Sequence, residues 1–207
     1  HTPPLSICII RISSMGDIVL VSPLLRILRA HFPGVRLDIA VAERFSELVE
    51  NNPHISTVHT IDTTGGIRGI LRQSRRIRAG VPGGNGYSVV LDLHVHIRSW
   101  LLRQRLGERT FRVDKFRRQK KNLVHHKQGI GEAIVPIAER YIRTASALGV
   151  SDDGKGLELW LPEEKELGYY PPDTLPVIVP QHPRRIAIAP GARHATKRWL
   201  PARFAEL

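Results

Sequence analysis

The beginning of the chain places the strongest constraint on the fold, because strand and helix patterns alternate there. Residues 7–12 form a short, mostly apolar run rich in β-branched side chains, which is typical of a buried strand. A polar turn follows, and apolar residues then recur at helical spacing between Ile18 and Leu28. Residues 35–41 alternate like a second strand. Two strands joined through one helix run parallel, so this βαβ unit predicts an α/β fold with a parallel sheet.

The same alternation continues over most of the chain. Pro23 interrupts the first helix and predicts a kink or the end of a first turn. Further elements are expected as strands at residues 56–61, 87–93, near 110–113 and 157–161, and as helices at residues 45–50, 67–78, 97–106 and 133–148. This order of strands and helices extends the predicted parallel α/β sheet along the chain.

Proline composition predicts a domain boundary. Five of the 15 prolines lie within residues 171–183, where a helix is therefore disfavoured. A new strand is expected at residues 185–189, followed by a glycine-containing turn and a helix that starts at Pro201. We expect an N-terminal Rossmann-like domain over residues 1–170, a linker over 171–184, and a second domain over 185–207 that stops within its first strand-loop-helix unit.

Positive charge is concentrated in the middle of the chain. The formal net charge is +12, and residues 68–127 hold 16 of the 31 Lys and Arg residues with only three acids. The whole excess of positive over negative charge therefore lies in this segment. Arginine supplies 24 of the positive charges, and its planar fork suits phosphate and carboxylate groups. The segment is either a solvated face or a surface for an anionic partner such as nucleic acid, an acidic membrane or a phosphorylated or carboxylated substrate.

Several classes of protein are disfavoured by the sequence. Cys8 is the only cysteine, so an internal disulfide or a zinc knuckle is excluded and a reducing, cytoplasmic setting is expected. No apolar run approaches the ~18 residues that a membrane-spanning helix requires. His94 and His96 are spaced to share a metal, but no Cys, Asp or Glu joins them at ligand spacing, and we expect no metal site.

The turn after the first strand is the expected ligand position, because open α/β sheets bind ligands at the carboxyl ends of their strands. It comprises Ser13, Ser14, Met15, Gly16 and Asp17. With a single glycine, it lacks the Gly-x-Gly-x-x-Gly fingerprint of dinucleotide-binding proteins. Asp17 has two interpretations, a cap for the helix that follows or a general base.

A second candidate turn covers residues 190–199. It follows an expected strand and precedes a helix, so its backbone N–H groups are able to face an anion. Thr196, Lys197 and Arg198 add a hydroxyl and two cations, although the spacing is not that of a Walker A loop. Taken alone, this pattern fits a generic basic turn equally well.

Taken together, the two turns resemble those of the family 9 glycosyltransferases, the ADP-heptose:lipopolysaccharide heptosyltransferases. Residues 9–20, followed by Ser22 and Pro23, resemble the opening segment of that family. Asp92 and Leu93, with Arg98 and Ser99 after them, resemble a second segment, in which the family commonly has glutamine at the position of His94. Residues 189–204 are similar to the donor loop of the family.

The resemblance implies a GT-B-like fold, in which two Rossmann-like domains face each other across a cleft, and a metal-independent, inverting enzyme without a cofactor. It implies that Asp17 takes the proton of the acceptor hydroxyl and that Thr196 and Lys197 hold the donor diphosphate. The remaining residues implied are Gly191 and Ala192 in the donor site, and Ser13, Ser14, His94 and Arg98 in the acceptor site.

The resemblance also implies partners. The donor is ADP-heptose, and the acceptor is the acidic inner core of lipopolysaccharide, which the positively charged residues 68–127 would contact. Peripheral contact with the inner face of the inner membrane is also implied. Because family members carry a complete second domain, residues 1–207 alone are expected to bind an ADP-sugar poorly.

Two alternatives remain on the residues alone. A non-enzymatic binder of nucleic acid or other polyanions would use residues 68–127, although few aromatic residues are interleaved there for base stacking. A Rossmann oxidoreductase is disfavoured by the missing glycine fingerprint.

Overall fold

The computed structural model describes residues 6–116 and 135–161 together with Arg198. The chain divides into two units, His1–Glu166 and Leu167–Leu207, and every helix and strand named below belongs to the first. The linker and the second-domain start expected over residues 171–207 lie outside the described residues, apart from Arg198, which is exposed. The domain boundaries therefore stay predictions.

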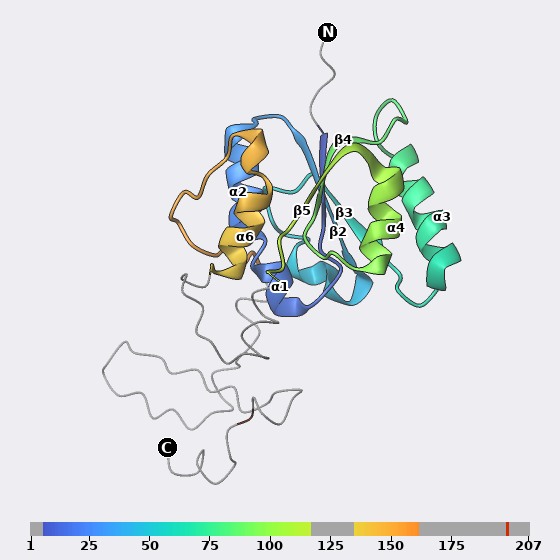
Figure 1. The fold of residues 1–207 in the computed structure, drawn as a ribbon, viewed down its shortest axis with the longest axis horizontal. Coiled ribbons are helices and arrows are strands. Elements are labelled where there is room, and N and C mark those ends of the chain that lie inside the picture. The colour runs from blue at the N-terminus through green and yellow to red at the C-terminus, as the bar shows by residue number, and fades with distance from the viewer. Residues whose placement is uncertain (1–5, 117–134, 162–197, 199–207) are drawn as a thin grey trace, which may run out of the picture. The chain divides into compact units, whose positions relative to one another are not determined.

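A five-stranded parallel sheet forms the centre of the described structure (Figure 1). Its strands are β1 (Ser6–Ile10), β2 (Arg36–Ala42), β3 (Thr57–Ile61), β4 (Tyr87–Asp92) and β5 (Gly107–Arg112). They lie in the order β3-β2-β1-β4-β5, and every neighbouring pair is parallel. The chain runs outwards from β1 to β3 and then crosses to β4 on the other side of β1. The loops that leave β1 and β4 thus flank the point where the strand order reverses, the usual ligand position of such sheets.

Helices cover both faces of the sheet (Figure 1). On one face lie α2 (Ser22–His31) and α6 (Ile137–Thr144), and on the other α3 (Gly66–Ala79) and α4 (Ile97–Leu106). The short helix α1 (Met15–Val19) follows the carboxyl end of β1, and the 3₁₀-helices η1 (Glu43–Leu48) and η2 (Ser146–Leu148) follow β2 and α6. Within the described residues, no helix combines the length and the apolar character needed to cross a bilayer.

Alternation along β1 divides the core into two layers. Ile7 and Ile9 belong to the apolar cluster beneath α2 and α6, whereas Cys8 and Ile10 belong to the cluster beneath α3 and α4. All four side chains are fully buried. Because successive side chains of a strand point to opposite faces, a continuous apolar run is what a strand covered on both faces requires. The predicted parallel α/β sheet is confirmed.

Prolines set helix boundaries that the apolar spacing did not reveal. The first helix is two helices, since α1 ends at Val19 and Pro23 lies in the first turn of α2, where its missing N–H costs no hydrogen bond. The helix expected at residues 133–148 begins only at Ile137, because Pro136 is its N-cap, and it ends at Thr144. The helix expected at residues 45–50 is the 3₁₀-helix η1.

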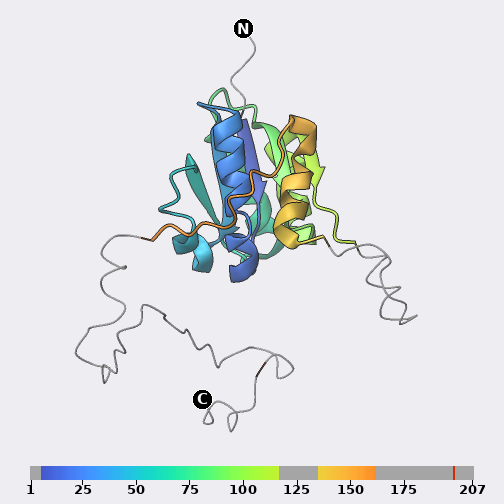
Figure 2. The same cartoon turned by 90° about the vertical axis from the view of Figure 1, so that its left-hand side faces the viewer.

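The prediction of a strand at residues 157–161 is wrong. Residues 151–161 have no regular secondary structure, and Figure 2 shows them passing across α2. Arg26 of α2 holds this segment, because Nε and Nη2 each donate to the Asp153 carboxylate at 2.8 Å and Nη1 forms an ion pair with Glu158 at 2.7 Å. The alternating leucines of the segment, which suggested a strand, are exposed. Contacts with a helix, rather than sheet pairing, therefore fix this extended segment.

We expect the change Arg26→Met to lower the free energy of unfolding by about 2 kcal/mol at neutral pH, since the two carboxylates lose a buried partner. Hydrogen bonds from Arg26 lower the pKa of Asp153 to about 2, so this contribution exists above the ordinary carboxyl pKa and fades as the pH falls towards 2. Urea unfolding measures both effects. The matched change Arg143→Met, which removes an exposed pair with Glu139 on α6, should cost less than about 0.5 kcal/mol. Equal losses for the two variants would contradict the anchoring role of Arg26.

Candidate functional site

Arg11, the residue that follows β1, connects the separate parts of the candidate site. Its backbone N–H donates to the carbonyl of Ala40 at 3.0 Å, which continues the pairing of β1 with β2. Its guanidinium donates through Nη1 to the carbonyl of Leu93 at 2.6 Å and forms an ion pair with Asp17 through Nη2. The same group lies over the ring of Tyr141 on α6, 5.6 Å from the ring centre. One buried arginine thus joins the ends of β1 and β4 to α1 and α6.

Asp17 lies in the first turn of α1, and three groups bind the same one of its oxygens. Oδ2 accepts the backbone N–H of Ser14 at 3.2 Å and the Ser14 hydroxyl at 2.9 Å, and it forms the ion pair with Arg11. No hydrogen bond reaches Oδ1 from the described residues. Burial raises the pKa of Asp17, but the Arg11 charge and the bonds from Ser14 outweigh it, and the pKa lies below its usual value. Asp17 is therefore ionised at neutral pH, with one oxygen held and the other available.

A cavity of about 230 Å³ opens beside Asp17. Lys115 and Arg140 contribute positive charge to its lining besides Arg11, and Asp114 contributes a second carboxylate. Lys115 donates to the carbonyl of Val95 at 3.1 Å, and the Arg140 guanidinium lies 4.6 Å from the ring centre of Phe116. Burial raises the pKa of Tyr141, which also lines the cavity, to about 12, so its phenol keeps the proton. Three cations around one small cavity suit an anionic ligand group.

Asp92, at the end of β4, organises the loop that forms the other side of the site. Its Oδ1 accepts the backbone N–H groups of His94 at 3.1 Å and Val95 at 2.8 Å, and its Oδ2 accepts the Ser99 hydroxyl at 3.1 Å. Val95 has φ +47°, which is rare for a β-branched residue. The buried carboxylate of Asp92 therefore holds a sharp turn in place, and this role is structural.

His94 lies partly buried in this turn. Burial and, after it, the nearby charges of Arg11 and Lys115 lower its pKa to about 4. Its Nδ1 atom is buried and has no hydrogen-bond partner within the described residues. His94 is therefore neutral at pH 7, able to exchange hydrogen bonds with a ligand but not to supply charge. No three potential metal ligands lie together in the described part of the chain.

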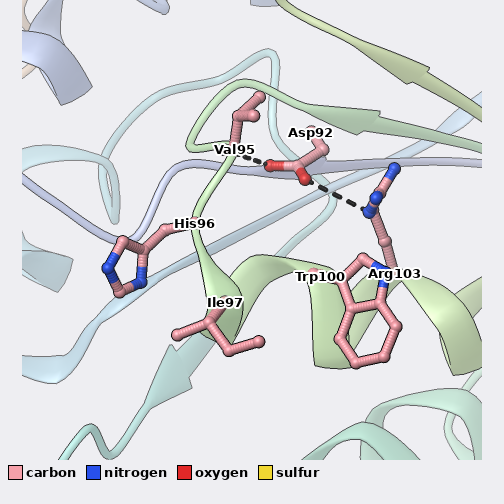
Figure 3. A pocket seen from close by; sticks show the side chains of 6 residues that line it. All are labelled: Asp92, Val95, His96, Ile97, Trp100 and Arg103. Carbon is pink, nitrogen blue, oxygen red and sulfur yellow. Dashed lines mark hydrogen bonds and ion pairs between the residues drawn. The ribbon is translucent and has the colours of Figure 1, made fainter.

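A second, more apolar groove of about 490 Å³ lies beside the start of α4 (Figure 3). Val95, Ile97 and Trp100 supply its apolar lining. Figure 3 shows Asp92 between the backbone of Val95 and the side chain of Arg103, whose Nε is 3.5 Å from Oδ2 of Asp92.

The structure brings together some of the predicted site residues and not others. Ser13 and Ser14 lie in the turn before Asp17, and His94 lies close enough to Arg11 for the two to interact electrostatically. Arg98 is exposed in the first turn of α4. Of the predicted acceptor residues Ser13, Ser14, His94 and Arg98, none is among the described residues that line the cavity beside Asp17. The predicted donor residues Gly191, Ala192, Thr196 and Lys197 lie outside the described residues.

Sequence reasoning did not identify Arg11, Lys115, Arg140 and Tyr141 as residues of the site. Arg11 carried a usable signal, because it is a charged residue directly after a buried apolar strand. Such a position calls for a buried counter-charge. The three others come from segments more than 100 residues beyond Arg11, and no local pattern links them to it.

A parallel sheet covered by helices on both faces, with the strand order reversing between β1 and β4, is a Rossmann-like arrangement, and GT-B proteins are built from two domains of this kind. Solved structures share this fold. The structure of a glycosyl transferase family 9 protein from Veillonella parvula aligns with a TM-score of 0.70 and 22% identity, over 98% of this chain and 58% of that protein.

Two Escherichia coli structures align less completely. Heptosyltransferase WaaC with ADP-2-deoxy-2-fluoro heptose gives a TM-score of 0.56 and 19% identity over 73% of this chain and 51% of that protein. ADP-heptose lps heptosyltransferase II gives a TM-score of 0.53 and 18% identity over 78% of this chain and 48% of that protein. No protein-family model and no curated protein matches the sequence. The chain spans about half the length of these solved proteins. Because these structures share its fold, the predicted GT-B-like fold is confirmed.

Proposed function

We propose that this chain belongs to an inverting family 9 glycosyltransferase that transfers a heptose from ADP-heptose to the acidic inner core of lipopolysaccharide. One observation carries the proposal: Asp17 is held ionised through one oxygen at the rim of a cation-lined cavity, where the strand order of the sheet reverses. The shared fold with WaaC, whose solved structure contains an ADP-heptose analogue, supports a nucleotide-sugar donor.

In this proposal Asp17 is the general base. Its Oδ1 takes the proton of the acceptor hydroxyl while the hydroxyl oxygen bonds to the anomeric carbon of the heptose. The bond from that carbon to the diphosphate breaks on the opposite side, and ADP leaves with the bonding electrons, so the configuration at the anomeric carbon is inverted. Arg11 keeps Asp17 ionised, which makes the base available and at the same time lowers its basicity.

The acceptor binds, in this proposal, in the cavity beside Asp17. Lys115 and Arg140 face an acceptor carboxylate or phosphate, for which their charges are complementary. Ser13, Ser14 and neutral His94 exchange hydrogen bonds with sugar hydroxyls, and Arg98 contacts a more distant acidic group. Because the acceptor is lipid-linked, peripheral contact of a cytoplasmic protein with the inner membrane forms part of the proposal.

The donor site is proposed for residues 185–207, with residues 171–184 as the linker that joins them to the acceptor domain of residues 1–170. Lys197 and Thr196 hold the diphosphate and stabilise its developing charge, and Gly191 and Ala192 leave space for its close approach. Neither a metal nor another cofactor takes part in this scheme.

The proposal is tested by incubating the natural polypeptide that contains this chain with ADP-heptose and a lipopolysaccharide inner-core acceptor. We expect release of ADP that depends on the acceptor, and a glycoside with inverted anomeric configuration by NMR. Retention of configuration, or transfer that requires a divalent cation, would contradict the mechanism. ADP release at the same rate with and without acceptor would contradict the transfer itself.

A further inference from the structure

Large apolar side chains are exposed where α3 and α4 begin. Ile67 in the first turn of α3 is 63% exposed, and Ile97 in the first turn of α4 is 56% exposed. Trp100, three residues after Ile97 and therefore on the same side of α4, is 44% exposed. Both helices follow strands of a parallel sheet, so these residues lie at the carboxyl edge, as Asp17 does. Several large apolar side chains exposed along one edge indicate a surface that meets an apolar partner.

The groove beside α4 adds to this apolar surface. Val95, Ile97 and Trp100 line it, and its volume of about 490 Å³ is larger than that of the cavity beside Asp17 (Figure 3). In Figure 3 the side chains of Ile97 and Trp100 lie along the helix, on the side of the groove away from Asp92. The groove is open to solvent through the exposed Trp100 and Ile97.

The same two helices carry a strong positive charge. Arg68, Arg72 and Arg75 recur at i, i+4 and i+7 and are exposed, whereas Ile70 and Ile77 face the core. Ten arginines and only two acids lie between residues 66 and 112. Within the described part of the chain, no ion pair joins an arginine of α3 to an acid. The positive charge of α3 is thus directed to solvent rather than neutralised by the fold.

We propose that this surface docks on an anionic lipid bilayer. Ile67, Ile97 and Trp100 enter the interfacial layer of the bilayer, and the arginines of α3 contact the phosphates of the headgroups. A bilayer surface offers negative charge and an apolar layer directly beneath it, and tryptophan is enriched at that depth in membrane proteins. A nucleic acid offers phosphates but no apolar layer for the two isoleucines.

The proposal assigns a surface to the membrane contact, and it does not depend on the transfer reaction. Because the surface and Asp17 share the carboxyl edge of the sheet, docking brings the cavity beside Asp17 close to the membrane. A lipid-linked acceptor then reaches the site without leaving the bilayer. Loss of transferase activity with bilayer binding retained would refute the proposed function alone.

Sedimentation of the full chain with vesicles tests the proposal. We expect binding to equimolar phosphatidylcholine and phosphatidylglycerol vesicles, weaker binding at high salt, and little binding to pure phosphatidylcholine. The triple change Arg68→Gln, Arg72→Gln and Arg75→Gln should lower the partition coefficient about a hundredfold, because each arginine contributes about 1 kcal/mol near an anionic surface. The double change Ile97→Ser and Trp100→Ser should lower it about tenfold, and thermal unfolding checks that each variant is folded.

Matched controls lie on the opposite face of the sheet or on the segment that crosses α2. Arg143→Gln and Trp160→Ser alter exposed residues of the same types, and Lys155→Gln removes a further exposed positive charge. Each should change the partition coefficient by less than about threefold. A chain that keeps Trp100 as its single tryptophan should show blue-shifted fluorescence and shielding from acrylamide on anionic vesicles. A chain that keeps only Trp160 should show neither.

Three results would overturn the proposal. They are absence of binding to anionic vesicles, equal losses for the controls and the surface variants, and full binding by the variant that lacks Ile97 and Trp100. Binding to duplex DNA that is tighter than binding to vesicles and insensitive to the two apolar changes would show that the surface serves a polyanion instead.

Discussion

Replacing Asp17 with asparagine is expected to lower kcat for heptose transfer by about 10²- to 10⁴-fold, the usual contribution of a general base. An asparagine oxygen still accepts the bonds that Oδ2 receives from Ser14, so α1 keeps its first turn. What the amide lacks is the ability to take a proton from the acceptor hydroxyl. Steady-state kinetics on the natural full-length polypeptide measures the loss, and thermal unfolding measures whether the fold is intact.

Asp114 provides the matched control for this substitution. It lines the same cavity, but it is exposed and accepts the backbone N–H of Phe116 at 2.8 Å. The change Asp114→Asn removes a charge from the same cavity without removing the proposed base, and kcat should fall by less than about tenfold. Near-normal turnover of the Asp17→Asn variant would remove the base assignment. A loss of equal size in both variants would mean that the net charge of the cavity, rather than one carboxylate, controls the rate.

Replacing Arg11 with methionine is expected to raise the pKa of Asp17, because burial remains and the counter-charge is lost. Carbon-13 NMR of the Asp17 carboxyl group measures this change directly and needs no substrate. In kinetics, the acid limb of the kcat/KM profile should move to higher pH. Arg11→Lys keeps the charge but not the planar fork, so it should restore most of the pKa and less of the stability.

The same variant is expected to lose about 2–3 kcal/mol of stability at neutral pH, because Arg11 also binds the carbonyl of Leu93 and lies over Tyr141. Asp17 has a lower pKa in the folded state than in the unfolded chain, so its pair with Arg11 stabilises the fold above the unfolded pKa of about 4. That part of the stabilisation fades as the pH falls through the folded pKa. Urea unfolding should therefore show that the difference in free energy of unfolding between the natural chain and the Arg11→Met variant becomes smaller in acid. A difference that is constant with pH would mean that Arg11 acts only through packing and its neutral partners.

Local patterns predicted most of the elements in the sheet. The helix expected at residues 97–106 has those bounds, and the strands expected at residues 56–61 and 87–93 differ from the observed ones by a single residue at one end. The strand expected at residues 35–41 is shifted by one residue, to Arg36–Ala42. These elements were predictable because apolar periodicity and burial agree along them. Leu157, Leu159 and Leu161 also alternate, but their side chains are exposed. Arg26 holds the segment through Glu158, between the leucines, and through Asp153, before them, so the same pattern did not form a strand.

Local contacts of the candidate site were likewise predictable from the sequence, whereas its contacts between distant residues were not. Asp17 and Ser14 are three residues apart, and the sequence already indicated that they begin a helix after a buried strand. Whether Asp17 caps that helix or acts as a base was open, because both roles need the same residue at the same position. The structure shows the capping contacts, because Oδ2 of Asp17 accepts the backbone N–H and the hydroxyl of Ser14. The general-base role stays a proposal, and the groups that support it, Arg11 and the cavity beside Asp17, meet Asp17 only in the folded chain.

By itself, the sequence determined the parallel α/β class, the position of Asp17 after the first strand, and the excess of arginine between residues 68 and 127. These three properties follow from periodicity, chain order and composition. Each can be read from the sequence because none requires contacts between residues that are distant in the chain. Only the tertiary structure decided that one oxygen of Asp17 is held by Arg11, that Lys115 and Arg140 enclose the same cavity, and that the arginines of α3 are directed to solvent. The reason is that counter-charges and cavity walls come from residues distant in the sequence, and packing of the sheet and its helices brings them together.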